Sequence, residues 1–120
     1  MREKISLCSE KNKVLIIDID GVLAVERKFT SYENLVPIDE AKESIAILKK
    51  QGFKIILHTS RYSAEKKETT SWLEANGIEY DEIRFDKPRG IIYVDDRGYR
   101  FKGWKSFFED VELMESTVES

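Results

Sequence analysis

Three unbroken apolar runs dominate the sequence, and polar residues soon follow each of them. The runs span residues 14–17, 55–57 and 91–94. Strands that are buried on both faces of a parallel sheet carry such runs, whereas strands with one solvated face alternate apolar and polar residues. The runs therefore predict an α/β chain built on a mainly parallel sheet.

Apolar residues at helical spacing lie between and after these runs, which predicts amphipathic helices. Glycines 52 and 77 stand where two of these helices should end. Because strands and helices alternate, right-handed crossovers and a Rossmann-like three-layer α/β/α sandwich are expected, with weaker strands near residues 83–85 and 99–101. The helical positions are Ala41, Ile45 and Leu48, then Trp72 and Leu73, then Trp104, Phe107, Phe108 and Val111.

Length and composition indicate a single domain. The chain has 120 residues and 41% hydrophobic residues, enough for a core without disulfides, and we expect one domain over residues 1–120 with its core at about 13–114. The one cysteine, Cys8, excludes an internal disulfide and favours a reducing, cytoplasmic setting. The sequence contains no apolar segment of membrane-spanning length, so we expect no membrane partner. The net charge is −3 and charges of both signs are mixed, which weighs against nucleic acid as a partner without excluding it.

Ionisable residues follow the predicted strands, where a parallel sheet places its ligand site. The first run is followed by Asp18-Ile19-Asp20-Gly21-Val22, and the second by His58-Thr59-Ser60-Arg61. The third is preceded by Lys87-Pro88 and followed by Asp95-Asp96-Arg97. We therefore expect one site at the carboxyl edge of the sheet.

The acids of this edge favour a metal-assisted reaction at phosphorus. Asp18 and Asp20 are two residues apart, so both carboxylates face the same side of an extended chain. If Asp95 and Asp96 join them, their repulsion requires a cation, and oxygen ligands favour Mg²⁺. A carboxylate such as Asp18 can then attack phosphorus, while Asp20 transfers protons.

Phosphate-binding groups complete the predicted site. Gly21 allows a sharp turn that leaves backbone N–H groups free for phosphate oxygens. The hydroxyls of Thr59 and Ser60 donate hydrogen bonds, and the Lys87 ammonium offsets the charge that develops on phosphorus. Cationic side chains are the expected substrate contacts, namely Lys28, Arg61, Arg89 and Arg97.

The order of these motifs resembles the haloacid dehalogenase (HAD) superfamily of phosphatases. The resemblance implies an aspartyl-phosphate intermediate on Asp18, with Asp20 as general acid/base and Mg²⁺ held by both. It also implies that Thr59 and Lys87 hold the phosphate. The remaining metal ligands would be Asp95 and Asp96, directly or through water.

Within that superfamily the chain resembles small capless members, some of which accompany surface-polysaccharide genes. Both places where a cap is inserted are short here, so the pocket is expected to be open unless a second subunit covers it. The implied activity is hydrolysis of a sugar phosphate or related small metabolite. Two positions depart from the pattern: Asp86 stands where glycine is common, and Val22 where threonine is commoner.

Two alternatives remain open. Capless members also act on polynucleotide 3′-phosphates, although the acidic net charge weighs slightly against nucleic acid. A non-hydrolytic phosphoacceptor domain of the response-regulator type also gathers acids, a hydroxyl and a lysine. Such domains carry the acid pair first, whereas here Asp18 and Asp20 come first and the adjacent pair last.

Overall fold

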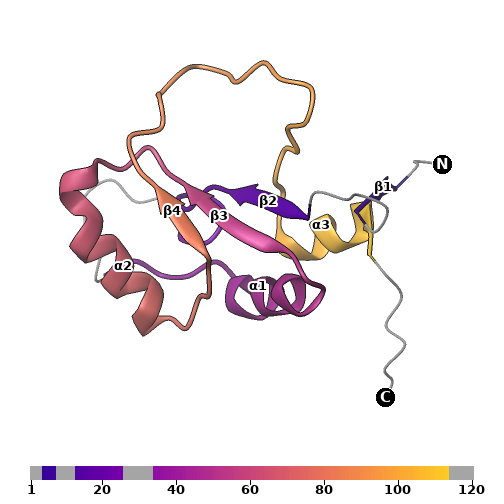
Figure 1. The fold of residues 1–120 in the computed structure, drawn as a ribbon, viewed down its shortest axis with the longest axis horizontal. Coiled ribbons are helices and arrows are strands. Elements are labelled where there is room, and N and C mark those ends of the chain that lie inside the picture. The colour runs from indigo at the N-terminus through magenta and orange to yellow at the C-terminus, as the bar shows by residue number, and fades with distance from the viewer. Residues whose placement is uncertain (1–3, 8–12, 26–33, 114–120) are drawn as a thin grey trace.

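The computed structural model describes residues 4–7, 13–25 and 34–113 of the chain. Strands and helices alternate through most of this part, as Figure 1 shows. A short 3₁₀ turn, Ser63–Glu65, precedes the second α-helix. The elements are β1 (Ile5–Ser6), β2 (Val14–Ile17), α1 (Ala41–Lys50), β3 (Lys54–His58), α2 (Lys66–Ala75), β4 (Glu82–Arg84), α3 (Trp104–Asp110) and β5 (Val111–Glu112).

The central sheet contains three parallel strands in the order β2-β3-β4. Val14 lies opposite Lys54, and Ile56 lies opposite Glu82. A second, two-stranded parallel sheet joins β1 to β5. The predicted α/β class with parallel strands is therefore confirmed.

Helices α1 and α2 lie on the same side of the sheet, below it in Figure 1. The predicted apolar faces are buried: Ala41, Ile45 and Leu48 on α1, and Trp72 with Leu73 on α2. The ring nitrogen of Trp72 also donates to the Leu35 carbonyl at 2.9 Å, which ties α2 to the segment before α1. Among the described residues, no helix is both long and apolar enough to cross a bilayer.

Helix α3 is anchored by Trp104. Its side chain is buried, and its ring nitrogen donates to the Val22 carbonyl at 3.0 Å, next to the turn that follows β2. Phe107 and Phe108 are half-buried against the core.

The apolar stripe was expected to stay helical through Val111, but α3 ends at Asp110 and Val111 pairs with Ile5 instead. β1, which contains Ile5, lies before the core boundary expected near residue 13.

The prediction of a strand over residues 91–94 is wrong. Residues 85–103 carry no regular secondary structure, and this segment, which we call the arch, rises away from the sheet in Figure 1. Ile91, Ile92 and Val94 are 105%, 71% and 91% exposed. A parallel connection needs about a dozen residues, whereas only residues 85–90 separate β4 from this run. The weaker strand expected near residues 99–101 is also absent from the arch.

Candidate active site

Asp18 lies at the carboxyl end of β2, immediately before a tight turn. Its Oδ1 accepts a hydrogen bond from the Ile19 N–H at 2.8 Å, which fixes the carboxylate. Gly21 has φ +89, a backbone conformation that few L-residues adopt, so its predicted role in the turn is confirmed. Its N–H donates to the Ala24 carbonyl at 2.8 Å. The N–H of Gly21 itself is therefore not free for a phosphate oxygen in the described structure.

Thr59 holds Lys87 at the carboxyl end of β3. The Thr59 side chain is fully buried, and its carbonyl accepts a hydrogen bond from the Lys87 N–H at 2.9 Å. Its Oγ1 accepts from the Arg61 N–H at 3.1 Å, and a hydroxyl that accepts in this way keeps its own proton to donate. The neighbouring Ser60 carbonyl accepts from Arg89 Nη2 at 3.3 Å.

Lys87 points back to Asp18. Its Nζ lies 3.9 Å from Asp18 Oδ2 and 4.5 Å from the centre of the Tyr93 ring. Three of the predicted site residues, Asp18, Thr59 and Lys87, are thus gathered at the carboxyl ends of β2 and β3. This edge combines a carboxylate, a cation and a hydroxyl, which is a set of groups suited to a phosphate ester.

Burial raises the pKa of Asp18 above its ordinary value of 3.8, and the nearby Asp20 carboxylate acts in the same direction. The Lys87 ammonium and the Ile19 N–H lower the pKa of Asp18, but burial is the larger effect. Burial and the Lys87 charge also lower the pKa of His58 below 6.5, so this histidine is neutral at pH 7. Asp18 is therefore a more basic carboxylate than a solvated aspartate.

Arg61 positions Asp20. Its side chain is 2% exposed, and it grips both carboxylate oxygens, with Nε 3.0 Å from Oδ2 and Nη2 2.8 Å from Oδ1. Its Nη1 donates to the Thr69 hydroxyl at 3.1 Å. The expectation that Arg61 contacts substrate is not supported, because three nitrogens of its guanidinium are already bound to Asp20 and Thr69.

Asp95 and Asp96 lie on the exposed arch. Asp95 Oδ1 accepts from the Arg97 N–H at 2.6 Å within the arch itself, which also carries Arg97. Within residues 4–7, 13–25 and 34–113, no three His, Cys, Asp or Glu side chains gather as a metal site would require. The predicted acid cluster is therefore not assembled, because the strand that should deliver its second half is missing from the sheet.

The described arrangement does not fit a divalent cation. Asp18 faces Lys87, and Asp20 is bound by Arg61 at both oxygens. Each of the two acids at the sheet edge is thus already partnered by a positive charge. The predicted substrate contact Lys28 lies outside the described residues.

Asp86 has a structural role that the sequence did not reveal. Its φ of 62 lies in the left-handed region, which explains why glycine suits this position. Its carboxylate accepts a hydrogen bond from the Ser63 N–H at 3.2 Å, and its own N–H donates to the Arg61 carbonyl at 2.9 Å. The Asp-Lys-Pro sequence could have indicated a turn, but the partners of Asp86 depend on the tertiary fold.

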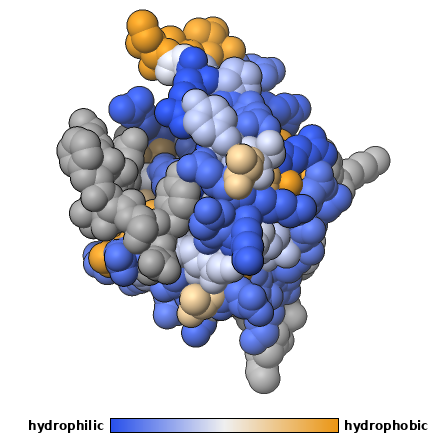
Figure 2. Space-filling view, turned by 90° about the vertical axis from the view of Figure 1, so that its left-hand side faces the viewer, coloured by the Kyte–Doolittle hydropathy of each residue, from blue (hydrophilic) through white to orange (hydrophobic). Residues whose placement is uncertain are grey.

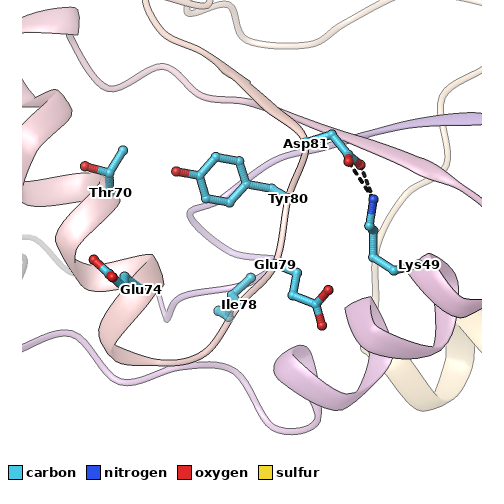
Figure 3. Close-up of a pocket in the computed structure, with 7 residues that line it drawn as sticks. All are labelled: Lys49, Thr70, Glu74, Ile78, Glu79, Tyr80 and Asp81. Carbon is cyan, nitrogen blue, oxygen red and sulfur yellow. Dashed lines mark hydrogen bonds and ion pairs between the residues drawn. The ribbon is translucent and has the colours of Figure 1, made fainter.

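A hollow of about 520 Å³ lies at the opposite ends of the strands. Figure 3 shows Lys49 and Asp81 paired beside it, with the Lys49 Nζ 2.6 Å from Asp81 Oδ1. Asp81 also accepts from the Ile55 N–H at 2.7 Å, so the pair ties the end of α1 to β3 and to the residue before β4. This hollow is distant along the strands from Asp18, and we regard it as part of the scaffold.

Fold and site together define an α/β protein with an acid–lysine pair at the carboxyl edge of its parallel sheet. The chain is similar to a structural-genomics target from Vibrio cholerae whose crystal structure is known, with 27% identity, a TM-score of 0.63, and coverage of 79% of this chain and 86% of that chain. It is also similar in fold to a chain in the Pnkp1/Rnl/Hen1 complex, with 24% identity and a TM-score of 0.56.

The second likeness covers 81% of this chain but only 33% of the other, so the chain spans about a third of that neighbour. Both neighbours share the α/β fold described above. No family model and no curated protein sequence matches the chain.

Proposed function

We propose that this chain is a HAD-like phosphatase that hydrolyses phosphate monoesters. The observation that carries the proposal is the approach of Lys87 Nζ to within 3.9 Å of Asp18 Oδ2 at the carboxyl edge of the parallel sheet. The fully buried Thr59 lies at the end of the adjacent strand. The likeness of the fold to a chain of the Pnkp1/Rnl/Hen1 complex supports this class.

In this proposal Asp18 is the nucleophile. Its Oδ1 is held by the Ile19 N–H, so Oδ2 is the oxygen that attacks phosphorus. A bond forms from Oδ2 to phosphorus while the bond to the ester oxygen breaks, and water later cleaves the aspartyl-phosphate to release phosphate. The Lys87 ammonium and the Thr59 hydroxyl bind the phosphoryl oxygens and offset the charge that develops on them.

Asp20 is the proposed general acid/base. The guanidinium of Arg61 donates one hydrogen bond to each carboxylate oxygen of Asp20 and so fixes its orientation. A carboxylate oxygen that accepts one hydrogen bond retains a lone pair that can bind a proton. Protonated by solvent before the first step, Asp20 would give that proton to the leaving alcohol, and the resulting carboxylate would later take a proton from the attacking water. Arg61 would act through Asp20, as a positioning residue.

The expected Mg²⁺ requirement is a prediction that applies only if Asp95 and Asp96 reach Asp18, which does not occur within the described arrangement. Hydrolysis measured with EDTA and then with restored Mg²⁺ tests this requirement. Activity that is lost with the chelator and regained with the metal would show that Asp95 and Asp96 reach Asp18 in the working protein.

The proposed substrate is a small phosphorylated metabolite such as a sugar phosphate. A polynucleotide 3′-phosphate is the second candidate, because one of the structural neighbours belongs to the Pnkp1/Rnl/Hen1 complex. The net charge of −3 favours the first. The two are separated by the salt dependence of substrate affinity, which is steep for a polynucleotide and shallow for a singly phosphorylated metabolite.

The test of the activity is hydrolysis of a generic aryl phosphate by the full chain and by Asp18→Asn. Loss of turnover on this isosteric change is the expected result, because an amide does not attack phosphorus. Glu79→Gln is the matched control, since it makes the same change at an exposed carboxylate beside the hollow at the other end of the strands. Equal rates for wild type and Asp18→Asn would discard the proposed function.

A further inference from the structure

Tyr62 and Arg89 lie together beside the proposed phosphate site. The central carbon of the Arg89 guanidinium is 5.3 Å from the centre of the Tyr62 ring. Arg89 Nη2 also donates to the carbonyl of Ser60, the residue after Thr59, at 3.3 Å. A guanidinium over an aromatic ring is attracted to the ring face, while the N–H groups at its edge can still bind an acceptor. Two contacts thus hold Arg89 at the carboxyl edge of the sheet.

These two residues belong to the same two segments as the residues proposed to bind phosphate. Thr59 and Tyr62 follow β3, and Lys87 and Arg89 follow β4. The Lys87 N–H donates to the Thr59 carbonyl at 2.9 Å, which places the two segments side by side. We call Thr59 and Lys87 the inner pair, and Tyr62 and Arg89 the outer pair. The outer pair therefore lies next to the place where the phosphate of a substrate would bind.

Backbone hydrogen bonds hold the outer pair in position. The Tyr62 N–H donates to the Glu65 carboxylate at 2.8 Å. The Asp86 carboxylate accepts from the Ser63 N–H at 3.2 Å, and the Asp86 N–H donates to the Arg61 carbonyl at 2.9 Å. These bonds tie the segment after β3 to the segment after β4. A site whose parts are already ordered loses less conformational entropy when a ligand binds.

Arg89 keeps hydrogen-bond donors for a ligand. Arg61 is bound to Asp20, whereas no carboxylate in the described part of the chain pairs with Arg89. Arg89 is exposed, and Tyr62 is 58% exposed. Figure 2 views the molecule from the side of α2, where the described surface below the arch is mostly hydrophilic. A planar guanidinium on such a surface can bind a carboxylate or a phosphate through two parallel hydrogen bonds.

The two pairs are close enough to be bridged by one small metabolite. The acceptor of Arg89 is the carbonyl of Ser60, which directly follows Thr59. Consecutive Cα atoms are about 3.8 Å apart, so only a short path separates the Arg89 guanidinium from the inner pair. A ligand with a few carbon atoms between two anionic groups therefore has the length to reach from one pair to the other.

We propose that the outer pair selects substrates whose leaving group carries a second anionic group, either a carboxylate or a phosphate. This inference rests on the proposed function, because the first anionic group is the phosphate that the inner pair binds. Arg89 would bind the second group, while the Tyr62 ring would hold the guanidinium and contact the carbon chain between the two groups. Neither residue takes part in bond breaking, so both determine specificity. A phosphorylated sugar acid or a bisphosphorylated sugar has the required chemistry.

The test is isothermal titration calorimetry of the full chain with three phosphonates, in a buffer that contains Mg²⁺. Ester cleavage does not break a carbon–phosphorus bond, so binding is measured without turnover. Propylphosphonate carries one anionic group, and the other two ligands have the same carbon chain ending in a carboxylate or in a second phosphonate. We expect at least one doubly anionic ligand to bind about tenfold more tightly than propylphosphonate. The ligand that gains affinity identifies the preferred second group.

Arg89→Met should abolish this preference, because methionine donates no hydrogen bond. Arg89→Lys keeps the positive charge but not the planar set of donors, so it should retain only part of the preference. Lys54→Met is the matched control, since it removes the same charge at the opposite end of β3, where Lys54 pairs with Glu82 at 3.7 Å. This control should show the same preference as the wild type. Circular dichroism shows whether each variant is folded.

Two results would overturn the inference. One is equal affinity of the wild type for all three ligands, and the other is a preference that persists in Arg89→Met. If the wild type still hydrolyses an aryl phosphate and Asp18→Asn does not, either result discards this inference alone and leaves the proposed function standing. Failure of all three ligands to bind would discard the phosphate site itself, and this inference with it.

Discussion

Replacing Arg61 should destabilise the fold strongly, because its buried guanidinium holds Asp20. Arg61→Ala removes two hydrogen bonds to Asp20 and one to Thr69. Removing one partner of a buried ion pair costs roughly 3–5 kcal/mol. The Asp20 side chain is 32% exposed, so water compensates in part. We therefore expect a loss of about 2–4 kcal/mol in the free energy of unfolding.

The assay is urea unfolding at one fixed protein concentration, followed by circular dichroism and by the fluorescence of the buried Trp72 and Trp104. A double-mutant cycle with Asp20→Ala isolates the pair, and a coupling energy of about 1–3 kcal/mol is expected for residues in one network. Lys49→Met, which breaks the Lys49–Asp81 surface pair, should cost clearly less.

Arg61→Lys separates positioning from substrate binding. Lysine keeps the positive charge but lacks the planar guanidinium that binds both carboxylate oxygens of Asp20 at once. If Arg61 orients Asp20, kcat falls while KM changes little; if it binds substrate, KM rises. A loss below about 1 kcal/mol in Arg61→Ala, or a coupling energy near zero, would refute the reasoning that this ion pair organises the site.

Three further outcomes follow from the site and the core. The acid limb of the pH profile of kcat/KM should lie above pH 3.8, since burial raises the pKa of the Asp18 nucleophile and the carboxylate must be ionised to attack; a limb at or below 3.8 would contradict this. Because the folded state binds the Asp18 proton more tightly than the unfolded state, wild-type stability should fall as pH rises from 3.8 through the raised pKa. Asp18→Asn should remove that fall, so the variant should be the more stable protein at pH 7 but not below pH 3.8 in urea titrations. Trp104→Phe should cost about 1 kcal/mol in thermal unfolding, because it leaves the partly buried Val22 carbonyl without its donor; an unchanged midpoint would show that this bond does not anchor α3.

The sequence predicts those parts of the fold that depend on local pattern. β2 and β3 follow from their apolar runs, and the buried faces of α1 and α2 follow from helical spacing. The position of Asp18 is also predictable, because a polar residue after a buried parallel strand must lie at the carboxyl edge.

Prediction fails where a side chain's role depends on chain connectivity or on distant partners. Residues 91–94 have the composition of a strand, but the six residues 85–90 are too few for a parallel crossover within one molecule. Arg61 illustrates the second kind of failure. Its sequence neighbours favour a phosphate contact, whereas its burial is set by Asp20 and Thr69, which belong to other elements.

The pairing of β1 with β5 has a mechanical consequence. The two strands run parallel, with Ile5 opposite Val111 and Ser6 opposite Glu112. In a parallel pair, a pull on the amino end of one strand and the carboxyl end of the other slides the strands along each other, so the ladder bonds bear the load together. Tension between Ile5 and Glu112 would therefore shear this small sheet instead of peeling it open one bond at a time.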